Sequence, residues 1–334
     1  MSTGPIIGRL FQVGIAKEGT RGTAESAASF WIPFSELQID ERWEDAVDEQ
    51  SQGVIEGSVG ETRVKEWAEG TIKAPITDKH FPLILLSILG SLSTGANADA
   101  SGNVKDHTIT VGQSAQHQSL TLFLNDPAAT GGAQDYKHAL GVVSSLEISY
   151  QQGQFVSYSA SVKAKKGVQA SLTPSQSTEN RFLSQHVVFK IASNLAGLGA
   201  ANALNIRSLS LKIDQNIEDD MVLGSKAPND YLNKQFTIEG QLEARWDDEA
   251  TFKTAALAGT TKAFRIDLQN TDVTIGTSAN PGLTIDLAKV VFTAITRPAK
   301  LGDIVVQTLQ FRAHYSISDS KMVTIKATNL QTSY

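Results

Sequence analysis

The stretch NADASGNVKDHT carries the side chains whose spacing comes closest to an ion site. The first, third, fifth and sixth positions of a calcium-binding loop are matched by Asn97, Asp99, Ser101 and Gly102. Such a loop ends in a glutamate that binds the ion through both oxygens, whereas this stretch ends at Thr108 and continues into an expected strand. Residues 97–108 are therefore predicted to form a polar hairpin, with a calcium site as the alternative.

A run of carboxylates offers a second kind of chemistry. It consists of Asp40, Glu41, Glu44, Asp45, Asp48 and Glu49. Paired carboxylates can act as acid and base in glycoside hydrolysis, but aromatic residues for a sugar platform make up only 7% of the chain. The tryptophans are dispersed, at positions 31, 43, 67 and 246. Glu44 and Asp45 recur as Glu218 and Asp219, which favours a role in a repeated fold over one catalytic site; a solvated charged face is the alternative.

Other catalytic and cofactor patterns are absent from the sequence. It contains no cysteine, which excludes disulfides, thiol catalysis and cysteine-ligated metals. The histidines show no zinc-binding spacing; they stand at positions 80, 107, 117, 138, 186 and 314. There is no Gly-x-Ser-x-Gly elbow and no glycine-rich phosphate loop. We therefore expect a protein that is not an enzyme and uses no cofactor, metal or small-molecule substrate.

The composition is typical of a folded protein with no affinity for membranes or nucleic acid. Hydrophobic residues make up 41% and charged residues 19%, and no apolar run is long enough to span a bilayer. The formal charge of -6 argues against sequence-independent DNA binding, because such binding depends on counterion release by Lys and Arg. One short basic cluster, Lys163, Lys165 and Lys166, is interpreted as a solvated strand end.

One phrase occurs twice, about half the chain apart. ELQIDERWED at 36–45 and SLKIDQNIED at 210–219 share Leu-x-Ile-Asp, a two-residue gap, a large apolar residue and Glu-Asp. Further matches follow in the same order. They are LFQVGIAK at 10–17 with LSQHVVFK at 183–190, AEGTIKA at 68–74 with IEGQLEA at 238–244, Gly90 with Gly259, and VKA at 162–164 with IKA at 325–327. Several matches in one order predict a duplicated domain.

The boundary between the two domains is predicted from a change in composition. Residues 168–180, VQASLTPSQSTEN, are rich in Ser, Thr and Gln and show no periodic apolar pattern. We interpret them as a linker, with residues 1–167 as the first domain and residues 181–334 as the second.

Alternation of apolar and polar residues predicts that each domain is mainly β. The clearest strands are FVSYSASVKA at 155–164, FTIEGQLEAR at 236–245 and TLQFRAHYSIS at 308–318. One helix is expected in each domain, at 79–89 after the possible cap Asp78 and at 249–258 after Asp247 and Asp248, with Gly90 and Gly259 as the stops. The predicted fold is two tandem β-sandwich or open-barrel domains, each with one short flanking α-helix.

The order of these features resembles the tail tube proteins of long-tailed bacteriophages. The shared features are the Leu-x-Ile-Asp strand, an acidic variable loop, a Glu-Gly strand (WAEGTIKAPI, FTIEGQLEAR), a short helix ending in Leu-Gly or Ala-Gly (SILG, AALAG) and alternating C-terminal strands. The duplication resembles siphophage tail tube proteins that carry two tube domains in one chain. The resemblance covers nearly the whole chain and depends on strand and glycine patterns rather than on a diagnostic signature.

The resemblance implies a structural protein of the virion, assembled in the host cytoplasm. In that family, inner sheets join side by side into a closed ring, rings stack into a hollow tube, and the DNA genome passes through without specific binding. Two wall domains per chain imply a homotrimer with pseudo-sixfold symmetry; six chains per ring are the alternative, if one domain lies outside the wall. The implied partners are the chain itself, the tape measure protein and the tail terminator and tip proteins.

The resemblance also points to particular surfaces. Positions expected to face the lumen are Asp40, Glu69, Thr71, Asp214, Glu239, Gln241 and Glu243. Two variable loops, about 46–64 and 220–234, match the loop with which the family contacts the neighbouring ring, and their polar composition suits segments that become ordered on assembly. A two-domain β-sandwich binding module, decorating a virion or binding carbohydrate, is the alternative function.

Overall fold

The computed structural model describes residues 6–127, 134–246, 252–299 and 301–334, and the chain folds mainly as β-strands, as predicted. The first half of the molecule comprises β1 (Gln12–Lys17), β2 (Phe30–Ile32), β3 (Glu36–Asp48), β4 (Gly60–Pro75), α1 (Phe81–Leu89), β5 (Gly90–Asn97), β6 (Lys105–Val111), β7 (Leu120–Asn125), β8 (Asp135–Gln151), β9 (Ser157–Ala164) and β10 (Val168–Ala170). A 3-10 turn, Gly8–Leu10, precedes β1.

The second half comprises β11 (Val187–Ala192), β12 (Ala203–Leu204), β13 (Ile206–Asp214), β14 (Ile217–Asp220), β15 (Asp230–Asn233), β16 (Thr237–Arg245), α2 (Lys253–Leu257), β17 (Lys262–Gln269), β18 (Gly282–Thr296), β19 (Val306–His314) and β20 (Val323–Asn329). Two 3-10 turns, Ser184–His186 and Leu195–Leu198, flank β11. None of the helices in the described ranges is long and apolar enough to cross a bilayer.

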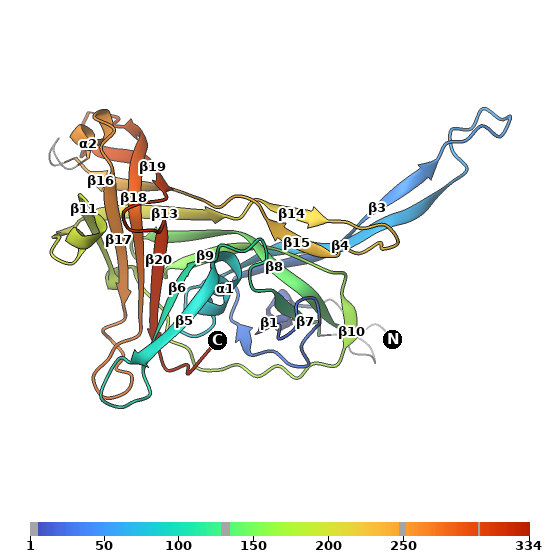
Figure 1. Cartoon of the computed structure of the whole chain (residues 1–334), viewed down its shortest axis with the longest axis horizontal. Helices are drawn as coiled ribbons and strands as arrows, with labels where there is room; N and C mark the ends of the chain where they lie inside the picture. Colours follow the sequence, from blue (N-terminus) through green and yellow to red (C-terminus); the bar gives the residue numbers. More distant parts are fainter. Residues whose placement is uncertain (1–5, 128–133, 247–251, 300) are drawn as a thin grey trace.

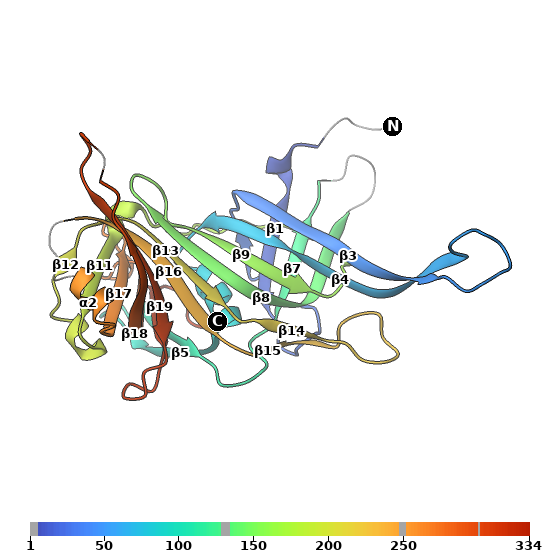
Figure 2. The same cartoon turned by 90° about the horizontal axis from the view of Figure 1, so that it is seen from above.

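One antiparallel sheet runs through both halves, and we call it the central sheet (Figure 2). Its order in the first half is β3-β4-β9-β8, and its order in the second half is β13-β16-β19-β18. Pairing of β8 with β13 joins the two groups of four strands. The same strand order thus occurs twice, side by side, in one open sheet.

The outer layer has a separate arrangement in each half. In the first half β2, β1 and β7 lead to β8, and β10 pairs on the other side of β8. In the second half β12, β11 and β17 lead to β18, and β20 pairs on its other side. The long strands β8 and β18 therefore belong to both layers, and the core lies between the layers.

Alternation along the strands separates the core from a polar face. In β9, Tyr158, Ala160 and Val162 are buried, whereas Ser157 and Ser159 on the opposite face are partly exposed. This confirms the strand predicted at 155–164, and β16 confirms the strand at 236–245.

The strand predicted at 308–318 was too long at its C-terminal end. It ends at His314, and Tyr315 and Ile317 are 51% and 88% exposed instead of facing the core. The chain turns there into β20, and alternation alone continues across such a turn.

The helix predicted at 79–89 is α1, and all nine of its side chains are buried. Gly90 ends the helix with a φ of 88°, a conformation that favours glycine. The predicted cap was wrong: His80 is the N-cap residue, and Asp78 instead accepts hydrogen bonds from the backbone and side chain of Asn180.

The second predicted helix, 249–258, is represented by the short helix α2, and Gly259 follows it with a φ of 62°. Its predicted caps, Asp247 and Asp248, lie outside the described residues.

The stretch considered as a calcium loop forms the polar turn of the β5–β6 hairpin, as its polar character predicted. Its Asp99 carboxylate accepts hydrogen bonds from Ser101 and, at 2.6 Å, from the backbone N–H of Thr277 in the second half. Strand β6 pairs with β20 over residues 105–110, and His107 contacts Asn329 at 3.1 Å. The hairpin therefore joins the two halves through the outer layer.

The segment predicted as a linker has structure at both ends. Val168–Ala170 form β10 on β8, and Glu179 is tied to the start of α1 by His80 Nδ1–H at 2.6 Å and by the Thr77 hydroxyl. His80 Nε2 lies 3.1 Å from the Tyr158 hydroxyl. The linker is thus fixed to the first half by a buried polar network.

This network makes stability depend on pH. Burial raises the pKa of Glu179, but the hydrogen bond and charge of His80, together with hydrogen bonds from Thr77 and Ser177, outweigh burial and leave that pKa below its ordinary value. A lowered carboxyl pKa stabilises the fold above the unfolded-state value and is lost as pH falls through the folded-state value. Glu179→Gln should cost roughly 1–3 kcal/mol at pH 7 and less at pH 3.5, measured by urea unfolding.

Asp78→Asn provides the matched control. Burial raises the pKa of Asp78, so this group stabilises the fold more at low pH than at high pH. Asp78→Asn should therefore make the free energy of unfolding fall more steeply as the pH is lowered, whereas Glu179→Gln should make it fall less steeply. Equal losses for Glu179→Gln at both pH values would contradict the assignment.

Candidate assembly surfaces

The polar face of the central sheet holds all seven residues singled out in the sequence. On the first half, Asp40 pairs across the strands with Glu69, and Thr71 follows Glu69 on the same face. On the second half, Asp214 lies on β13, and Glu239, Gln241 and Glu243 alternate along β16. All seven are at least partly exposed. The structure thus brings them to one continuous surface; a lumen on that side remains a prediction.

Ion pairs reduce the net charge of this face. Its acidic residues are matched by basic neighbours in the pairs Arg42–Glu69 (3.2 Å), Lys73–Glu36 (2.6 Å), Lys212–Asp214 (3.8 Å) and Arg312–Glu239 (2.5 Å). These side chains are largely exposed, so each pair adds little stability. Their effect is a polar surface with a weak overall field, which has little attraction for phosphates.

At the junction between the two halves, the central sheet continues from β8 of the first half to β13 of the second half. Strand β8 pairs with β13 from Ser145↔Asp214 to Gln151↔Ser208. Leu146 and Ile148 meet Ile213 and Leu211 across the junction, and all four are 0% exposed. Beyond β13, Gln215 donates its side-chain N–H groups to the carbonyls of Ser87 and Val143.

At the two outer ends of the central sheet lie β3 and β18, which occupy the same places in their halves as β13 and β8 but have a free edge. Among the described residues, β3 pairs only with β4, and residues 291–296 of β18 pair only with β19. Leu37, Ile39 and Ile295 pack against the core but are only half-buried. Unpaired strand edges are templates for another strand. The two free edges, β3 and residues 291–296 of β18, lie at opposite ends of the central sheet.

The first variable loop is a long β-hairpin, residues 44–65, which we call the first arm (Figure 1). It projects away from the rest of the molecule, and its pairing continues to Asp48↔Gly60. Residues 46–64 were expected to become ordered on assembly. In the single chain they form this hairpin, with no regular strand at its tip, residues 49–59, and the part that assembly plays stays a prediction. The tip exposes Val54 and Ile55 at 63% and 102%.

The second variable loop, predicted at about 220–234, lies within a hairpin of β14 and β15, residues 217–233, which we call the second arm. It lies on the first half: Tyr231 is 0% exposed and donates to the carbonyl of Ala164, and Asp230 pairs with Arg21 at 2.6 Å. Lys163 bonds Asp219 of this arm at 2.8 Å. The basic cluster interpreted as a solvated strand end is therefore partly an ion-pair site between the halves.

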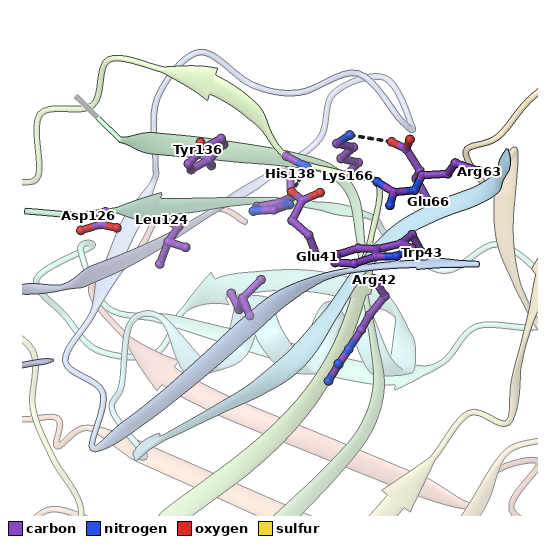
Figure 3. A pocket seen from close by; sticks show the side chains of 12 residues that line it. Glu41, Arg42, Trp43, Arg63, Glu66, Leu124, Asp126, Tyr136, His138 and Lys166 are labelled. Carbon is purple, nitrogen blue, oxygen red and sulfur yellow. Dashed lines mark hydrogen bonds and ion pairs between the residues drawn. The ribbon is translucent and has the colours of Figure 1, made fainter. Parts of the chain in front are cut away.

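A pocket of about 450 Å³ lies at the base of the first arm (Figure 3). Its lining residues are Ile39, Glu41, Arg42, Trp43, Arg63, Glu66, Leu124, Asp126, Tyr136, His138, Lys166 and Gly167. The Arg63 guanidinium lies 4.5 Å from the centre of the Trp43 ring, which is on a side chain 53% exposed. The pocket forms where strands from distant parts of the sequence meet.

Titratable side chains of this pocket form hydrogen bonds with neighbouring groups of the protein. Glu41 accepts a hydrogen bond from the backbone N–H of Gly167 at 2.7 Å. A hydrogen bond from Lys166 holds the pKa of Glu66 below its ordinary value. Burial lowers the pKa of His138, which leaves its ring neutral at pH 7.

The run of carboxylates is split by the structure. All of its members except Glu49 lie on β3, where Asp40 and Glu41 are neighbours and so point to opposite faces of the sheet. Within the described ranges, no three His, Asp or Glu side chains gather in a way that could hold a metal ion.

Sequence reasoning missed the free edge of β18, the pocket and the β6–β20 pairing. One signal for the β6–β20 pairing was available in the sequence. The segment that follows α1 is long enough for the β5–β6 hairpin, whereas only residues 258–261 separate α2 from β17.

Comparison with protein families identifies a relative group for this chain. A family model described as phage tail tube protein matches residues 8–313. No curated protein matches the chain. The matched region spans both halves and all the surfaces described above.

Proposed function

The chain belongs to the phage tail tube protein family, and we propose that three copies close into a ring with pseudo-sixfold symmetry. Rings of this kind stack into the hollow tail tube, and the polar face of the central sheet lines the bore through which the DNA genome passes. Asp40, Glu69, Thr71, Asp214, Glu239, Gln241 and Glu243 are the proposed bore residues. The family membership and the open, mainly β sheet support this proposal.

The β8–β13 junction is the observation that carries the ring proposal. Each group of four strands begins with β3 or β13 and ends with β8 or β18. Since β8 accepts β13 inside the chain, β18 is positioned to accept β3 of the next chain by the same antiparallel pairing. Such a contact is head-to-tail, and it closes into a ring when the rotation at each junction is a whole fraction of a turn.

The remaining parts of the proposal follow from the tube. The first arm would contact the neighbouring ring, because it is the segment that projects farthest from the sheet (Figure 1). The tape measure protein inside the tube and the terminator and tip proteins at its ends are the proposed partners. The protein would act in the virion of a siphophage, after assembly in the host cytoplasm.

Negative-stain electron microscopy of the purified chain tests this function. Hollow tubes whose end-on averages show threefold symmetry with six similar wall units are the expected result. A protein that stays monomeric at high concentration, as a two-domain binding module would, overturns the proposal. Rings with six copies of the chain would overturn the three-chain arrangement while leaving the tube.

A further inference from the structure

The two helices occupy matching places but differ in exposure. Ile88 and Leu257 each stand two residues before the glycine that ends the helix, Gly90 or Gly259. Ile88 is 0% exposed, whereas Leu257 is 74% exposed. A large apolar side chain at the end of a helix is therefore covered in the first half and uncovered in the second.

Two features cover α1. One is the β5–β6 hairpin, since both strands contact the helix. The other comes from the second half: Gln215 donates to the carbonyl of Ser87, one residue before Ile88. The second half has no equivalent hairpin between α2 and β17, so α2 depends on whatever lies beyond the free edge of β18.

Helix α2 and the pocket at the base of the first arm lie on the same side of the central sheet. Phe252, just before α2, belongs to the main core and its ring centre is 6.0 Å from that of Phe292 on β18. On β3, Ile39 packs against the same core cluster, and Trp43 follows it on the same side by strand alternation. Helix α2 therefore lies beside the free edge of β18, and the pocket lies beside the free edge of β3.

We propose that the exposed end of α2, with Leu257 at its centre, seats in the pocket of the next chain in the ring. The occupant is thus a second copy of this chain. Trp43, Leu124 and Tyr136 supply apolar surface for the leucine (Figure 3). Pairing of β18 with β3 of the next chain would bring the two together, as pairing of β8 with β13 brings Gln215 to α1. This inference rests on the proposed ring.

The test compares the protein concentration needed for tube formation among single variants. Leu257→Ala and Trp43→Ala should each raise that concentration roughly 10- to 100-fold, as expected from exposing one large apolar side chain. The double variant should raise that concentration by less than the product of the two single increases, because both changes remove the same contact. Ile317→Ala, at a side chain 88% exposed and away from the pocket, serves as the matched control. Unchanged thermal unfolding of the monomers excludes a folding defect.

Crosslinking supplies a readout that a general loss of assembly cannot imitate. The chain has no cysteine, so Leu257→Cys with Tyr136→Cys and a short bismaleimide should link neighbouring chains in assembled tubes and not in monomers. Tubes of normal threefold symmetry that show no crosslink and no effect of Leu257→Ala would overturn this inference and leave the ring intact. Failure of the unmodified chain to form rings would overturn both.

Discussion

Replacing residues 46–62 by a two-residue Asn-Gly turn will give a folded chain that forms no tubes. Every side chain in this range is exposed, so its removal takes nothing from the core. Asp45 and Arg63 remain paired at 3.2 Å, and an Asn-Gly turn suits the two-residue hairpin that is left. The loss should be complete in micrographs, while the midpoint of urea unfolding changes little.

A second variant separates the length of the arm from its chemistry. Val54→Ser with Ile55→Ser keeps the hairpin and removes the apolar tip, where both side chains are more than half exposed. If ring-to-ring contact depends on that tip, isolated rings should accumulate in place of tubes. Normal tubes from the truncated chain would refute the role of the arm in stacking.

Cysteines at Thr296 and Asp40 in one chain will give a disulfide-linked trimer as the largest species on a non-reducing gel. The register comes from the internal junction, where Glu147 pairs with Lys212. Thr296 is the equivalent of Glu147. In β18 the register shifts between Phe292 and Ala294, two residues before Thr296, and in β8 it shifts between Val143 and Ser145, two residues before Glu147. Asp40 follows the residue that faces Gly70, as Lys212 follows the residue that faces Gly240.

Controls make this result specific. Glu147→Cys with Lys212→Cys should form its disulfide within one chain and leave a monomer, which shows that the internal geometry permits the bond. Each single cysteine should give no trimer. A series of bands ending at six chains would contradict the three-chain ring, and the absence of any crosslink in intact tubes would contradict the proposed register.

Local patterns predicted much of this fold because they reflect local physics. Alternation found β9 and β16, since a strand between a core and water must alternate. The apolar run before Gly90 found α1, although its cap was misassigned because Asp78 serves a contact with the distant Asn180. The family resemblance was confirmed over residues 8–313.

Short sequence matches were a weaker guide to equivalent positions. The match of VKA at 162–164 with IKA at 325–327 compares β9 with β20, but β9 lies in the central sheet between β4 and β8, whereas β20 lies in the outer layer between β18 and β6. Strand β19 is the one placed as β9 is. Apolar-Lys-Ala suits any half-buried strand, so it carries no information on partners.

Features built from distant segments could not be predicted. The pocket depends on Trp43, Leu124 and Tyr136, which only the pairing of whole strands brings together. The hairpin form of residues 46–64 was not predicted for a related reason. Polar residues are compatible with a hairpin that extends an existing strand pair, because the register is already set by the buried part of β3 and β4.

The β6–β20 pairing has a mechanical consequence for a tube made of this chain. Each junction inside a chain is held by two strand pairings, β8–β13 and β6–β20, and by the buried Tyr231. A junction between chains would be held by one strand pairing and by the contact of helix α2 with the pocket. Stiff and compliant seams would therefore alternate around the circumference. Bending of the tail would strain the three seams between chains in each ring before the three seams inside them.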